Sequence, residues 1–188
     1  MKDLETQNLR IRKFKIEDTM NVYENLVKEE ELKDKLSESI HTIDEARMQV
    51  YSFIKEYEMN EFVWAIEEKK SNIVIGYIRS IESSKVNRCC EIHFSIGYKW
   101  TDSNYMEEAL GEVIDYLFNV EKFSIIISKF CDGNKELAKN KSATLENVGM
   151  MKEAVLRNRK INERTGISEN KIVYSIVEEE FKKEKKVC

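Results

Sequence analysis

The 188-residue chain contains no proline, six glycines, four cysteines and only two histidines. No repeat and no shift in composition marks a linker, so we expect one domain over residues 1–181, followed by a charged tail at residues 182–188. The cysteines show no C-x-x-C spacing, and with two imidazoles as the other donors we expect no zinc site. Free thiols in a reducing compartment are the simplest interpretation of these cysteines.

Two further absences limit what the protein binds. No apolar run approaches the ~18 residues of a membrane span, and the first residues lack the apolar core of a signal peptide, so we expect a cytoplasmic protein that enters no membrane. Lysine and arginine number 31 against 35 aspartates and glutamates, which gives a formal net charge of −4. Because nucleic-acid-binding domains usually carry a basic face, this balance argues against nucleic acid as a partner.

The stretch from Cys89 to Leu117 predicts a strand, a short loop and a long helix. Apolar and polar side chains alternate over residues 91–96, the pattern of a strand with one buried face. Gly97 ends this strand, and residues 101–104 supply side chains that favour helix caps. A strand that leads into a helix N-terminus directs backbone N–H groups into a cleft, where anions commonly bind. After the cap, apolar residues recur at helical spacing and would form one stripe on a helix: Met106, Ala109, Leu110, Val113, Ile114, Leu117 and Phe118.

The rest of the chain interleaves strands and helices, which predicts a mixed sheet covered by helices. Expected strands cover residues 9–14, 62–66, 73–81 and 123–127, with a closing hairpin at 155–161 and 171–177; the apolar run 123–127 predicts burial on both faces. Expected helices begin at residue 16, at Thr42 with Glu45 as a capping box, and at Asn134, the last ending at Gly149. The charge-dense run 28–35 is interpreted as a solvated helix or connector, and His41 as a surface residue.

Several short segments occur in an order that is typical of one family. They are Leu4-Glu5-Thr6 with Leu9-Arg10-Ile11-Arg12, Val74-Ile75-Gly76-Tyr77-Ile78, Cys90-Glu91-Ile92-His93-Phe94-Ser95-Ile96-Gly97 with Tyr105 and Glu108-Ala109-Leu110, Leu145-Glu146-Asn147-Val148-Gly149-Met150, and Val155-Leu156-Arg157 with Gly166 and Tyr174-Ser175. In this order they resemble the GNAT acetyltransferases, in the branch of the ribosomal-protein N-terminal acetyltransferases. The resemblance covers most of the chain. It implies an α/β (α+β) single-domain fold with a central mixed, mostly antiparallel sheet flanked by helices, and acetyl-CoA as cosubstrate.

The resemblance also implies where acetyl-CoA binds. Backbone groups of Ser95, Ile96 and Gly97 would hold the pantetheine arm, and Tyr105 and Asn134 would make further cofactor contacts. Main-chain contacts of this kind do not depend on the identity of the side chain.

The family's pyrophosphate loop corresponds to residues 102–104, where this chain departs from the pattern. Asp102 and Asn104 replace its two glycines, with Ser103 between them. A carboxylate at a helix start can occupy the N–H donors that a phosphate needs. An ordinary capped helix is therefore an alternative to a working cofactor loop.

Three residues are catalytic candidates. Glu91 matches the glutamate of the family's A-E-I-G-Y segment and would accept the proton of the incoming amine if burial raises its pKa; the alternative is a strand glutamate paired with a lysine or arginine. His93, two residues later on the same face, would serve substrate selection or proton transfer. The family's N-x-x-S motif, which would supply the acid that reprotonates the CoA thiolate, is not retained in register. Ser142 is a nearby polar candidate for this role; the alternative is a helix-surface hydroxyl.

Two functions follow from these expectations. The first is an acetyl-CoA-dependent N-acetyltransferase that transfers its acetyl group directly to a primary amine, on a small molecule or a protein N-terminus. The second is a GNAT-fold protein without transfer activity that acts as a binding or regulatory module. The oligomeric state is left open, with a homodimer as one form.

Overall fold

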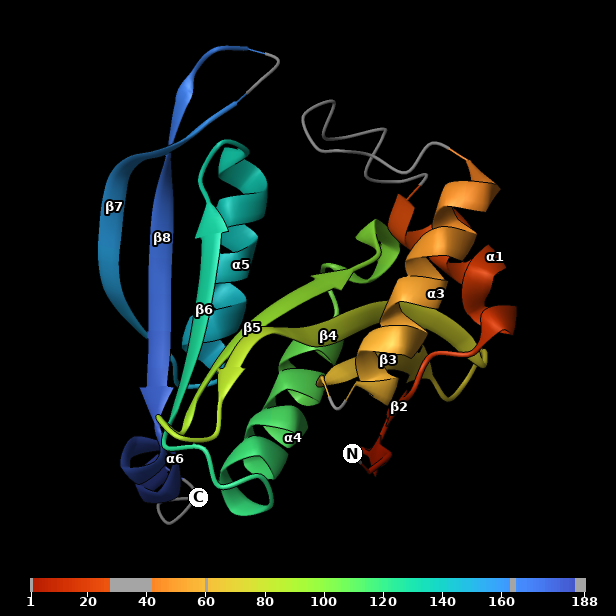
Figure 1. Ribbon diagram of the computed structural model, residues 1–188, viewed down its shortest axis with the longest axis horizontal. Helices are drawn as coiled ribbons and strands as arrows, with labels where there is room; N and C mark the ends of the chain where they lie inside the picture. Colours follow the sequence, from red (N-terminus) through yellow and green to blue (C-terminus); the bar gives the residue numbers. More distant parts are fainter. Residues whose placement is uncertain (1, 28–41, 60, 163–164, 185–188) are drawn as a thin grey trace. The chain divides into compact units, whose positions relative to one another are not determined.

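The computed structural model describes residues 2–27, 42–59, 61–162 and 165–184 (Figure 1). The charged run 28–35 and His41 lie outside these residues. The strands are β1 (Leu4–Glu5), β2 (Leu9–Arg12), β3 (Val63–Glu68), β4 (Ile73–Ser84), β5 (Cys89–Ile96), β6 (Ile125–Cys131), β7 (Met151–Ile161) and β8 (Ser168–Val177). The α-helices are α1 (Thr19–Val22), α3 (Ile43–Glu58), α4 (Tyr105–Asn119), α5 (Lys135–Asn147) and α6 (Glu178–Glu184).

The strands form one eight-stranded sheet in the order β1-β2-β3-β4-β5-β6-β8-β7. Five of its strand pairs are antiparallel, and β5 pairs with β6 in parallel. The predicted α+β fold with a mixed, mostly antiparallel sheet is therefore confirmed. By its internal contacts the chain forms two compact units, Met1–Ser80 with Phe94–Glu112 and Ile81–His93 with Val113–Cys188. These are called unit 1 and unit 2 below.

The core of unit 1 packs helices α1 and α3 against strands β3 and β4. Helix α3 begins at the predicted capping box, in which the Glu45 N–H donates to Thr42 Oγ1 at 3.2 Å and the Thr42 N–H donates to Glu45 Oε2 at 2.9 Å. The helix buries one apolar face, on which the centroid of the Phe53 ring lies 4.8 Å from that of Phe14. Burial of each such side chain stabilises the fold by about 1.5–3 kcal/mol. The cluster consists of Phe14, Val22, Leu26, Ala46, Val50, Phe53, Val63, Ala65 and Val74.

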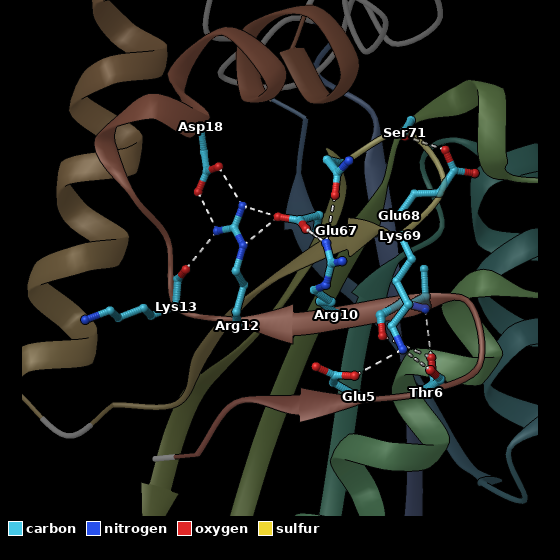
Figure 2. A network of polar contacts seen from close by, with 12 residues as sticks. Glu5, Thr6, Arg10, Arg12, Lys13, Asp18, Glu67, Glu68, Lys69 and Ser71 are labelled. Carbon is cyan, nitrogen blue, oxygen red and sulfur yellow. Dashed lines mark hydrogen bonds and ion pairs between the residues drawn. The ribbon is translucent and has the colours of Figure 1, made fainter.

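A network of charges joins β2, β3 and the turn before α1 in unit 1. Figure 2 shows Arg12 between two carboxylates, with its guanidinium 2.8 and 2.9 Å from the Asp18 oxygens and 2.6 Å from Glu67. All three side chains are nearly enclosed, with 11, 6 and 9% of their surface exposed. Hydrogen bonds to Asp18 and Glu67 raise the pKa of Arg12, although burial opposes the shift. Burial alone would raise the pKa of Glu67, but hydrogen bonds from Arg10 and Arg12 outweigh it and lower that pKa.

The sheet of unit 2 includes the first part of β5, then β6, β8 and the edge strand β7, with the β7–β8 hairpin predicted from the sequence (Figure 1). Strand β6 lies two residues later than expected and alternates between half-buried and buried residues. The prediction that it is buried on both faces is therefore wrong. Ile126, Ser128 and Phe130 lie on the buried face. The other face is half-buried, and it carries Lys129 together with Ile125, Ile127 and Cys131.

Helices α5 and α6, with the second half of α4, complete the described part of unit 2. Helix α5 is capped by Asn134, whose side chain accepts the Leu137 N–H at 3.0 Å, and it ends at Gly149 with φ of +83°, as predicted. Helix α6 was not expected, because residues 182–188 were interpreted as a frayed tail. Residues 182–184 instead belong to this helix, which is held by Phe181 packing 5.5 Å from the ring of Phe118.

Candidate active site

Strands β5 and β6 pair over only part of their length. The parallel pairing runs from Cys89 with Ile125 to Ile92 with Ser128, although β5 continues to Ile96. Beyond Ser128, the described part of β6 pairs only with β8. One edge of β5 is thus without β6 over its last four residues, 93–96.

Glu91 lies one residue before the pairing ends and forms an ion pair with Lys129 of β6. Both belong to unit 2, and their side chains are 11 and 30% exposed. The hydrogen bond to Glu91 raises the pKa of Lys129, while burial acts in the opposite direction. The structure thus contains the ion pair that was weighed as the alternative for Glu91. Lys129 was not a sequence candidate, because its partner lies 38 residues away along the chain.

His93 lines a cavity of about 450 Å³ in unit 2. The same cavity is lined by Lys129, so it adjoins the ion pair of Glu91. Its other lining residues come from β6, α5, β7 and β8: Phe130, Cys131, Leu137, Lys141, Arg159, Lys160 and Lys171. The charge of this cavity escaped the sequence analysis because its cations are spread over four elements.

Ser142 is not among the residues that line this cavity. It is half-buried on α5 and hydrogen-bonded to the hydroxyl of Tyr174, which in turn donates to Glu146 Oε1 at 2.7 Å. Burial raises the pKa of Tyr174. The structure therefore places His93 in the cavity lining, with Glu91 next to the cavity through its ion pair with Lys129, and it keeps Ser142 out of the lining.

The predicted pantetheine strand ends in a close backbone approach within unit 1. The Gly97 N–H donates to the Ile75 carbonyl at 2.8 Å, and a Cβ atom at Gly97 would lie 2.6 Å from the Asn25 carbonyl oxygen. A Cβ at Gly76 would likewise lie 2.7 Å from the Ser95 carbonyl oxygen. Only glycine allows the backbones to approach so closely at these two positions. Ser95 and Ile96 are half-buried beside them.

The loop before α4 differs from the capped helix that was weighed against a cofactor loop. Asp102 and Asn104 are exposed, and no described residue donates a hydrogen bond to the Asp102 carboxylate. Ser103 Oγ donates to the Trp100 carbonyl at 2.6 Å and lies 3.4 Å from the Tyr105 nitrogen, a long contact for a cap. Of the two candidate caps, Asp102 and Ser103, only Ser103 accepts an N–H at the start of α4, through this one long hydrogen bond. The charge of Asp102 is what still distinguishes the loop from a glycine-rich one.

Two other predicted cofactor residues already have local contacts. The Tyr105 hydroxyl is hydrogen-bonded to Glu68, and the Asn134 side-chain oxygen is occupied by the cap of α5. A contact that the sequence analysis missed holds the start of α4, where Glu108 accepts the Asn8 N–H and the Asn8 side-chain amide, both at 2.8 Å. Burial would raise the pKa of Glu108, but these hydrogen bonds outweigh it and lower the pKa.

Comparison with known proteins assigns this arrangement of strands to a family. A family model described as an acetyltransferase (GNAT) domain matches residues 8–156. The chain belongs to the GNAT acetyltransferase family. Acetyl-CoA is the acetyl donor that GNAT acetyltransferases use. No curated protein matches the chain.

Solved structures show the same fold at low sequence identity. A GNAT-family acetyltransferase from Bacillus anthracis is 21% identical with a TM-score of 0.79, covering 95% of this chain and 100% of its own. The ribosomal-protein-S5-alanine acetyltransferase from Vibrio fischeri is 15% identical with a TM-score of 0.77, covering 96 and 99%. The microcin C7 self-immunity acetyltransferase MccE, in complex with acetyl-CoA and AMP, is 15% identical with a TM-score of 0.78, covering 92 and 93%.

The residues of this GNAT protein fit an acetyl-CoA site. Pairing of β5 with β6 ends at Ile92, before the residues that were predicted to hold the pantetheine arm, and the Asp102 carboxylate takes no hydrogen bond from a described residue. Within the described residues there is no group of three His, Cys, Asp or Glu side chains that could hold a metal ion. None of the described helices has the length and apolarity needed to cross a membrane.

Proposed function

We propose that the protein is an N-acetyltransferase that transfers the acetyl group of acetyl-CoA directly to a primary amine. The observation that carries the proposal is the end of β5–β6 pairing one residue after Glu91. Strand β5 continues past this point to Ile96, and Glu91, a nearly enclosed carboxylate, lies on the same strand. Backbone groups of Ser95 and Ile96 hold the arm, and the start of α4 at residues 103–105 receives the pyrophosphate. We assign Gly97 no contact with the arm, because its N–H donates to the Ile75 carbonyl and its carbonyl accepts the Trp100 N–H.

Acetyl-CoA, when bound, supplies the acetyl group as a thioester. Glu91 accepts a proton from the amine, directly or through one water, so that the nitrogen lone pair can attack the acetyl carbon. A bond forms between nitrogen and that carbon, the carbon–sulfur bond breaks, and the electron pair leaves on sulfur. The ion pair with Lys129 requires the ionised carboxylate, which is the form of Glu91 that can accept a proton.

His93 and Lys129 orient the amine-bearing molecule, because both line the cavity beside Glu91. We assign Ser142 no direct step, since its hydroxyl is engaged with that of Tyr174. Cys90 is buried on the strand and serves packing, so transfer needs no acyl-enzyme. The acceptor is a primary amine, either of a small molecule or of a protein N-terminus.

Two measurements test the proposal together. Acetyl-CoA at ~100 times its dissociation constant should stabilise the protein by about 2.7 kcal/mol in thermal unfolding. Mass spectrometry of a panel of amines incubated with the protein and acetyl-CoA should then show acetylated products. Stabilisation without any product would favour the binding or regulatory module over the enzyme. No stabilisation would refute cofactor binding itself.

A further inference from the structure

The cavity beside Glu91 is lined by cations and by no carboxylate. Its nine lining residues include four lysines, one arginine and one histidine. They come from β5, β6, α5, β7 and β8, all within unit 2, so the charge is concentrated by the fold and not by a run in the sequence. The chain as a whole is acidic, with a net charge of −4. Such a local reversal of sign favours an anionic ligand.

Three of these cations lack a carboxylate partner in the part of the chain that the structure describes. Lys129 is neutralised by Glu91, but Arg159, Lys160 and Lys171 form no ion pair with a described residue. Two nearby carboxylates bind other groups: Asp132 accepts from Lys135 and Asn170, and Glu169 accepts from the Asn162 side chain at 2.9 Å. Arg159 and Lys160 are exposed and Lys171 is half-buried, so their positive charges are accessible to an anion in the cavity.

A backbone irregularity places two of the cations. Pairing of β7 with β8 shifts register between Leu156 and Lys160, and Asn158 within this bulge has φ of +53°. The Asn158 N–H donates to the Asn170 side chain at 3.2 Å, which holds the bulge. Bulges redirect the side chains that follow them, and the next two residues, Arg159 and Lys160, both line the cavity.

We propose that this basic cavity binds the phosphate group of the acceptor, so that the substrate is a small amine that carries a phosphate. The acceptor role rests on the proposed transferase function. A phosphate matches better than a single carboxylate, because its charge approaches −2 and its oxygens suit the fork of Arg159 together with lysine ammonium groups. The volume of about 450 Å³ suits a small molecule. Because Lys129 both lines the cavity and pairs with Glu91, the bound molecule presents its amine beside the base.

CoA carries phosphates too, so the test separates the two sources. O-phosphoethanolamine and ethanolamine share one primary amine and differ in the phosphate. Each is titrated calorimetrically at low salt into the wild type, into Lys160→Gln/Lys171→Gln, and into the control Lys70→Gln/Lys152→Gln. The control removes the same charge at positions outside the cavity lining. Unfolding temperatures and circular dichroism verify that each variant is folded.

The wild type and the control should bind O-phosphoethanolamine, and the cavity variant should bind it at least ~10-fold more weakly. Ethanolamine should bind measurably to none of the three proteins. The affinity of the wild type for O-phosphoethanolamine should be unchanged in the presence of saturating CoA. Equal binding by both variants, no binding by the wild type, or displacement by CoA would each overturn the assignment, the last by showing that the cavity holds a phosphate of the cofactor. Binding without acetylation would leave the phosphate site standing and count against the transfer activity instead.

Discussion

Replacing Arg12 with alanine removes the cation that two nearly enclosed carboxylates share. Its guanidinium donates to both oxygens of Asp18 and to Glu67, and 11% of its side chain is exposed (Figure 2). Breaking a buried ion pair by removing one partner costs about 3–5 kcal/mol, because the other charge is left buried and unpaired. Part of this cost is offset in the variant, because Glu67 still pairs with Arg10 and Asp18 still accepts the Lys15 N–H at 2.8 Å.

The lower end of that range, about 3 kcal/mol, is therefore expected for Arg12→Ala. For a chain of this length it corresponds to a fall of about 6–12 °C in the unfolding temperature. Arg10→Ala is the matched contrast: its side chain is 42% exposed and bridges Glu67 and Asn72, so its loss should cost no more than about 1 kcal/mol. Urea unfolding at pH 7 measures both.

The pH dependence gives a second test of the same reasoning. The pKa of Glu67 is lowered in the folded protein, so its contribution is complete above its ordinary pKa and is lost as the pH falls through the lowered value. The gap between the wild type and Arg12→Ala should accordingly narrow below about pH 4. Equal costs for Arg10→Ala and Arg12→Ala, or a gap that does not change with pH, would refute the account of this network.

Two further predictions concern the loop before α4 and the start of α5. Asp102→Gly/Asn104→Gly should bind acetyl-CoA ~10-fold more tightly, about 1.4 kcal/mol, because a charge near the pyrophosphate is removed. Since Asp102 caps nothing, the loss of stability should stay near ~1 kcal/mol; weaker binding in calorimetry would mean that the native loop suits its ligand. Hydrogen bonds from Lys135 and Asn170 lower the pKa of Asp132 to about 2. Asp132→Asn should therefore be less stable than the wild type above about pH 4, and the difference should vanish as the pH falls toward 2. A constant difference in urea unfolding would contradict this.

Local signals in the sequence predicted much of the fold. The capping box of Thr42 and Glu45, the cap at Asn134 and the stop at Gly149 each depend on residues within one or two helical turns, and all three are present. The alternation that predicted β5 is also local. Helix α6 was not predicted because it is too short to show periodicity. It is held by a contact between the rings of Phe181 and Phe118, which are 63 positions apart in the chain.

The candidate site was less predictable, for a physical reason. Glu91 could be chosen from its strand, but its partner depends on the parallel register that sets Glu91 opposite Ile127 and brings Lys129 to the same face. The point at which β5 and β6 stop pairing is a property of two strands together. The cations of the cavity belong to four elements whose side chains meet only after β7 has bulged and paired with β8.

The turnover of Glu91→Gln with acetyl-CoA and an accepted amine tests the central claim most directly. The substitution keeps the shape of the side chain and removes its ability to accept a proton, whereas Glu179→Gln, on the exposed side of α6, is the matched control. Glu91→Gln should lower kcat by about 10²–10⁴-fold with acetyl-CoA affinity nearly unchanged, and the control should match the wild type. Full activity of Glu91→Gln would contradict the assignment of Glu91 as the base.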